Sequence, residues 1–204
     1  MLFTHLTASS ALLLAGIVSA QTPAGFEPEV QDRLEIVFGS TVVETPGAEL
    51  GRSETEQQPT IGVSDEPLEG ASYLWIMVDI DVPSDFQNPS GSPRTTYLHA
   101  LITGFTPDSA PLDGVTTPDG APIYALAPPA QGSAGPVQYT GPAPPPETPP
   151  HPHRYVSLLY ETEADFAVTP DQVGQTLGFD VAAFAESVGL QSPPVRAGYF
   201  NVTG

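Results

Sequence analysis

Residues 73–83, YLWIMVDIDVP, are a largely apolar run in which charged residues occur only at odd positions, and this pattern predicts a β-strand with two distinct faces. The even positions are apolar throughout, so their side chains are predicted to form a core face. The odd positions begin with large apolar residues and end in Asp79 and Asp81. Residues two apart in a strand lie roughly 6.5–7 Å from each other, so both carboxylates are predicted to project toward the same space. Carboxylates on such an apolar wall need hydrogen-bond donors.

The rest of the chain carries further short strand patterns and one clear helix pattern. The helix is predicted over 181–188, with Asp180 as its N-cap and Gly189 as its stop. Many strands with one or two short helices predict a mainly β domain. The predicted strands are 34–38, 41–43, 60–63, 73–82, 95–105, 154–161 and 195–202, with weaker fragments at 123–126 and 137–139.

Proline is concentrated between the last strong strands. Seven of the eleven residues in 142–152 are proline, and a strong strand pattern resumes directly afterwards. The segment is too short for a linker between domains, so we interpret it as a stiff surface loop within one domain.

Residues 1–20 have the pattern of a signal peptide, because an apolar run is followed by the small-residue ending Val18-Ser19-Ala20. Cleavage is expected before Gln21, which leaves 21–204 as a single domain and predicts a secreted, extracellular protein. The apolar run is too short to span a bilayer of about 30 Å. Stable membrane insertion is therefore not expected.

The charge of the chain is strongly one-sided, with 24 acidic residues against five arginines and a net charge of −19. Such a surface repels nucleic acid and anionic bilayers, which proteins bind through clustered Lys and Arg. The absence of cysteine and lysine excludes thiolate metal sites, cysteine nucleophiles and Schiff-base chemistry. Any anion that binds must enter a local pocket.

Three separated segments together resemble the phosphatidylethanolamine-binding protein family. They are DIDVP at 79–83, His99 on the next strand, and His-Arg-Tyr at 153–155 before an apolar strand. The tail, with FDVAAFAESVGL and then PPVRAGYFNV, resembles that family's late helix and closing strand. The resemblance covers about 60–202, and the order and spacing of the set make it specific.

The resemblance implies a β-sandwich with a central sheet, short peripheral helices and a small surface pocket for an anion such as a phosphorylated lipid headgroup. By position, it assigns ligand binding to Asp79, Asp81, His99 and His153, with Tyr155 adjacent. In this interpretation the carboxylates orient and protonate the imidazoles, whose outward N–H groups bind the anion. A binding protein without a cofactor is expected, rather than an enzyme.

Other residues are predicted to support or shape this pocket. Arg154 is expected to brace the site from behind, Tyr97 to form part of its wall, and Pro83 to close the first motif. The chain departs from the family pattern at the pocket rim. Ile80 replaces the usual proline between the aspartates, Leu98 stands where a second histidine is common, and Pro152 replaces a glycine-containing approach to His153.

Other functions remain open from the residues alone. Asp and His are also ligands for divalent metals, although the sequence has no close His pair such as H-E-x-x-H. No G-x-S-x-G motif supports a serine hydrolase. Some members of the similar family inhibit peptidases, and the proline run or the N-terminal segment is a candidate surface for that. Asn201-Val202-Thr203 is an N-glycosylation sequon.

Overall fold

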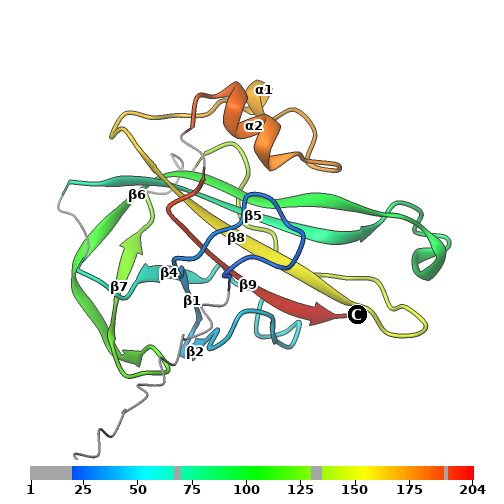
Figure 1. Ribbon diagram of the computed structural model, residues 1–204, viewed down its shortest axis with the longest axis horizontal. Helices are drawn as coiled ribbons and strands as arrows, with labels where there is room; N and C mark the ends of the chain where they lie inside the picture. The colour runs from blue at the N-terminus through cyan, green and yellow to red at the C-terminus, as the bar shows by residue number, and fades with distance from the viewer. Residues whose placement is uncertain (1–19, 67–69, 130–134, 191–192) are drawn as a thin grey trace, which may run out of the picture.

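The computed structural model describes residues 20–66, 70–129, 135–190 and 193–204, and these residues form mainly β-structure (Figure 1). The predicted signal peptide lies almost wholly outside the described residues. Two short α-helices, α1 (Pro170–Val173) and α2 (Val181–Ser187), and one 3-10 turn, η1 (Pro89–Gly91), accompany the strands. The strands are β1 (Glu35–Phe38), β2 (Thr41–Val42), β3 (Ala48–Glu49), β4 (Thr60–Val63), β5 (Ser72–Pro83), β6 (Arg94–Thr116), β7 (Pro122–Ala127), β8 (Pro152–Thr162) and β9 (Arg196–Thr203).

All the strands join in one curled sheet of order β2-β1-β4-β7-β6-β5-β8-β9-β3. The long strand β6 makes the curl, because its first half pairs with β5 and its second half pairs with β7. Figure 1 shows α1 and α2 together on one side of β5 and β8, with β1 and β4 on the other side. The predicted mainly β fold, with a central sheet and two short helices beside it, is confirmed.

Strand β5 is buried on both faces and separates two cores. Its even positions pack with side chains from the helices, including Val181 and Phe184 of α2. Its odd positions up to Met77 pack with Ile36 and Ile61 from the other half of the sheet. The polar ends of β5 and β8 therefore emerge from a strand pair that packing holds rigidly on both sides.

The predicted helix begins as expected. The Asp180 carboxylate accepts a hydrogen bond from the Ala183 N–H at 3.0 Å, and Gly189 follows the helix with a φ of 74°. Several details differ from the sequence predictions, among them a short strand at Ala48–Glu49. The helix α1 was not predicted, and strand β6 continues past residue 105. The fragment 137–139 contributes only an isolated bridge between Val137 and Leu101.

Asn201, the residue of the predicted sequon, lies inside the sheet. Strand β9 places it between Arg154 of β8 and Glu49 of β3. Its side-chain Nδ2, the atom to which a glycan would be attached, donates to the Gly47 carbonyl at 3.0 Å. One N–H of this nitrogen is therefore engaged in the folded protein, and a glycan could replace only the other hydrogen. None of the helices in the described ranges is long and apolar enough to cross a membrane.

Candidate functional site

Asp79, near the end of β5, lies beside His153, at the start of β8. The antiparallel register pairs Asp79 with Tyr155, so the His153 ring lies near the Asp79 side chain. His153 Nδ1 lies 2.7 Å from Asp79 Oδ2, and both side chains are almost completely buried. Because a buried carboxylate needs a hydrogen-bond donor, this bond explains how both polar side chains can be buried here.

Glu147 is the second partner of His153, and the sequence interpretation missed it. Its Oε1 lies 3.3 Å from His153 Nε2, so both nitrogens of the ring face carboxylates. The Arg94 guanidinium, at the start of β6, holds the same carboxylate with two hydrogen bonds of 2.7 Å. These bonds and the charge of Arg94 lower the pKa of Glu147 to about 2. The proline-rich segment thus supplies a buried ionic group.

The protonation of His153 follows from this arrangement. Burial alone would lower its pKa, but the hydrogen bond to Asp79 and the nearby carboxylates outweigh burial and raise the pKa. A protonated ring donates from both nitrogens, as the two carboxylates require. The two carboxylates therefore favour the imidazolium form of His153.

Asp81 does not share the space of Asp79. Its two oxygens accept hydrogen bonds from the Arg154 side chain at 2.7 Å each, and the Arg154 backbone N–H adds one at 2.9 Å. The pairing of β5 with β6 shifts register after Asp79, and Asp79 Oδ1 accepts the Asp81 N–H at 2.8 Å. This local irregularity breaks the simple alternation, so the prediction that both carboxylates face one space is wrong. The Arg154 hydrogen bonds outweigh burial and lower the pKa of Asp81.

His99 is held by the segment that precedes the proline run. Its Nδ1 lies 2.7 Å from the Thr140 carbonyl oxygen, and the Thr140 N–H donates to the His99 carbonyl at 2.9 Å. Because a carbonyl only accepts, Nδ1 must carry a proton. The rings of Tyr97 and Tyr155 pack edge-on against the imidazole, at centroid distances of 5.0 and 5.2 Å. Burial lowers the pKa of His99, so the ring is neutral near pH 7.

A cavity of about 220 Å³ opens beside these residues. It brings together Asp79, His99, His153, Tyr155 and Tyr97 among the predicted site residues. Asp81, Arg154 and Pro83 do not line it, and Arg154 is paired with Asp81 instead. The remaining lining residues are Val82, Phe86, Thr140, Gly141, Ala143, Pro144 and Pro145.

Gly141 allows the wall of this cavity to pack closely on another loop. A Cβ at this position would lie 2.9 Å from the Thr55 carbonyl oxygen and 3.2 Å from Glu56 Cα. The Tyr139 hydroxyl also donates to the Thr55 carbonyl, and the Thr148 N–H donates to Ser90 Oγ at 3.0 Å. These contacts fix the position of the segment around the proline run, which forms part of the cavity wall.

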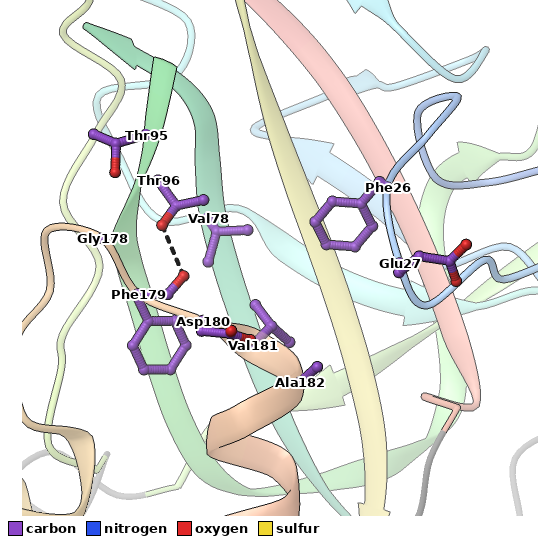
Figure 2. Close-up of a pocket in the computed structure, with 10 residues that line it drawn as sticks. All are labelled: Phe26, Glu27, Val78, Thr95, Thr96, Gly178, Phe179, Asp180, Val181 and Ala182. Atoms are coloured by element: carbon purple, nitrogen blue, oxygen red, sulfur yellow. Dashed lines mark hydrogen bonds between the residues drawn. The ribbon is translucent and has the colours of Figure 1, made fainter. Parts of the chain in front are cut away.

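A second cavity, of about 320 Å³, lies between the N-terminal segment and the start of α2 (Figure 2). Figure 2 shows the Glu27 carboxylate turned away from Val78 and Phe179, while the Thr96 hydroxyl is bonded to the Phe179 carbonyl at 2.7 Å. None of the predicted site residues lines it. Within the described ranges, no group of three or more His, Asp or Glu side chains is arranged to hold a metal ion.

Comparison with known families identifies the chain. The family model described as phosphatidylethanolamine-binding protein matches residues 31–200. The chain belongs to the phosphatidylethanolamine-binding protein family. The predicted resemblance is thereby confirmed, and the match extends beyond the segments from which it was inferred.

Relatives of this phosphatidylethanolamine-binding protein family member are diverse. Phomoidride biosynthesis cluster protein N of Talaromyces stipitatus is 28% identical over 207 residues, which cover 93% of each chain. A solved structure of a carboxypeptidase Y inhibitor complexed with its cognate proteinase is 19% identical, covers 85% of this chain and 84% of the other, and has a TM-score of 0.57. A phosphatidylethanolamine-binding protein from Plasmodium falciparum is 18% identical, with coverage of 84% and 86% and a TM-score of 0.53. At these identities the two structures support the fold alone.

Proposed function

We propose that the protein binds a small ligand through an anionic group, such as a phosphorylated headgroup, in the cavity beside His99. The proposal rests on the hydrogen bond between His99 Nδ1 and the Thr140 carbonyl. This bond occupies Nδ1 and leaves Nε2 as the ring nitrogen for a ligand in the cavity. A ring fixed in this way is a preorganised contact on a cavity wall. A binding function, rather than catalysis, fits the family.

His153 has a different role in this proposal from the one expected. Its outward nitrogen faces Glu147, so it is not the nitrogen that meets a ligand. Instead, its two hydrogen bonds fix Asp79 and Glu147 beside the cavity. His99 is therefore the residue to test, because replacing His153 would leave two buried carboxylates without their shared donor.

Calorimetric titration with phosphoethanolamine at several values between about pH 5 and 8 tests the proposal. Since burial lowers the pKa of His99 below its ordinary value of about 6.5, a lower pH favours the second proton on this ring. Binding should tighten as the pH falls, by about tenfold, and His99→Ala should weaken it and remove most of the pH dependence. His151→Ala is the matched control, because His151 is half-exposed and does not line the cavity. Equal affinity in wild type and His99→Ala would reject the proposal.

Peptidase inhibition is the second candidate, since one protein of the same fold is a carboxypeptidase Y inhibitor that was solved with its cognate proteinase. The candidate surface is the proline-rich segment or the N-terminal segment. If the protein acts in this way, micromolar amounts will inhibit at least one of a panel of serine carboxypeptidases. Undiminished activity across the panel would count against this function and would leave the ligand-binding proposal intact.

A further inference from the structure

The cations around the cavity are already neutralised. Among the described residues around the cavity, every such cation has a carboxylate oxygen within 3.3 Å of one of its side-chain nitrogens. No excess positive charge is left to attract a dianion into a chain whose net charge is −19. The pairs are Arg94 with Glu147, Arg154 with Asp81, and His153 with both Asp79 and Glu147.

The rim of the cavity is apolar. Phe86, in the turn between β5 and β6, leaves 59% of its surface exposed although it lines the cavity. Val82, Ala143, Pro144 and Pro145 are further apolar residues in the cavity lining. An exposed aromatic ring is unremarkable alone, but here it adjoins the cavity that contains His99. A ligand that covered Phe86 would remove apolar surface from water.

The neutral His99 ring presents an acceptor, because Nδ1 holds the proton that goes to Thr140. A ligand can meet Nε2 in two ways. It can bring its own proton, as an undissociated acid does, or the complex can take up a proton from water. Both ways favour a ligand with one ionisable acid group over a fully dissociated phosphate.

We infer that the ligand of this cavity is an organic acid of at most one negative charge, whose acid group meets His99 and whose apolar body packs on Phe86. This inference deepens the proposed function and rests on it. The cavity volume of about 220 Å³ is below the range of about 300–1,000 Å³ typical of pockets for drug-sized molecules. An acid with one ring or a short chain is therefore the fitting size class.

Binding of four probes separates this ligand class from phosphorylated headgroups. Benzoate, acetate, inorganic phosphate and phosphoethanolamine are titrated into the full protein at about pH 5.5 and 7.5. Benzoate should bind about tenfold more tightly than acetate, the factor expected from covering roughly 50 Å² of apolar surface. At about pH 7.5, where the phosphate groups are mostly dianions, it should also bind more tightly than either phosphate compound. Benzoate binding should tighten at the lower pH with uptake of a proton.

The groups that face His99 are Asp79 from β5, His153 and Tyr155 from β8, and Tyr97 from β6 itself. Burial and the charge of Asp79 raise the pKa of Tyr155, so its hydroxyl remains protonated. The pKa of His153 is raised by its carboxylate partners, so this ring holds its second proton more strongly than His99 does. The proton taken up on binding is thus expected at His99, and His99→Ala should abolish the uptake.

Two exposed apolar residues give matched variants. Phe86→Ala should reduce benzoate affinity to near that of acetate and leave acetate unchanged. Val195→Ala, which removes an exposed side chain that does not line this cavity, should change neither. If phosphoethanolamine or phosphate binds at least as tightly as benzoate and His99→Ala weakens it, the inference is wrong and the proposed function stands. If no probe binds, or if His99→Ala binds like the wild type, both are rejected.

Discussion

At the scale of single residues, the site is a chain of paired charges that runs from Arg94 through Glu147 and His153 to Asp79. The distances along it are 2.7, 3.3 and 2.7 Å. Three of the four side chains are almost completely inaccessible, so solvent screens their attraction only weakly. Removal of one member takes a charged partner away from each of its neighbours.

Glu147→Gln should therefore destabilise the protein by about 2 kcal/mol near pH 6, because Arg94 and His153 both lose a charged partner. Arg94 is partly exposed, which places the expected cost below that of a fully buried pair. Urea unfolding of both proteins measures the difference. Glu163→Gln, at an exposed position, is the matched control and should change stability by less than about 0.5 kcal/mol.

The pH dependence of that difference has a defined sign. The pKa of Glu147 is lowered from 4.5 to about 2, so its contribution is present above pH 4.5 and is lost as the pH falls through about 2. The pKa of His153 is raised, so its contribution is complete below about pH 6.5 and is lost as the pH rises through the folded value. The difference should be largest between these limits. The pKa of His99 is lowered, so this residue destabilises the fold as the pH falls. It does so equally in both proteins and therefore does not change the difference between them. A difference that did not vary with pH would contradict the pairing.

The partners of these residues differ in how well the sequence predicted them. The prediction that Asp79 and His153 lie together was correct, because Asp79 lies near the end and His153 at the start of strands with strong apolar patterns. Glu147 was missed because it lies in a proline-rich loop, where no periodicity fixes the direction of a side chain. Asp81 was predicted to face the same space as Asp79, but it binds Arg154 and does not line the cavity, since the register shift after Asp79 cannot be read from alternation.

At the scale of elements, the sequence predicted best the strands whose apolar residues match their burial in the fold. The centres of β5 and β8 are buried on both faces, and their apolar runs located them to within a few residues. The far half of β6 contains prolines and exposed positions, and it is a strand because β7 pairs with it at irregular register. Such pairing depends on contacts between distant residues, which a local pattern does not contain.

Helix α2 offers a prediction at this scale, because its first turn depends on one side chain. Asp180→Ala removes the acceptor for the Ala183 N–H and should cost about 1 kcal/mol. Glu186→Ala, on the exposed side of the same helix, is the control and should cost less than about 0.5 kcal/mol. Chemical denaturation of the two variants measures both values. Equal costs would show that the cap contributes nothing specific.

At the scale of the whole molecule, one-sided charge and a packed β-core are combined without any disulfide. The chain has no cysteine and a net charge of −19, so core packing and hydrogen bonds must stabilise it against its own repulsion. The acidic side chains are mostly exposed, while the buried acids of the site have cationic partners. The surface therefore repels anions in general, and the cavity is the place where an acidic ligand is expected.

Export is the remaining prediction at this scale, and it rests on residues 1–20. In a eukaryotic secretion host the full chain should reach the medium, and the N-terminal sequence of the secreted protein should begin at Gln21. Signal peptidase requires small residues one and three positions before the cut, so Ala20→Arg should block cleavage at this bond. Ser19→Leu, at the position between them, is the matched control and should be processed normally. A protein that stays inside the cell with Met1 intact would contradict the assignment of a signal peptide, and it would move the acidic ligand to an intracellular source.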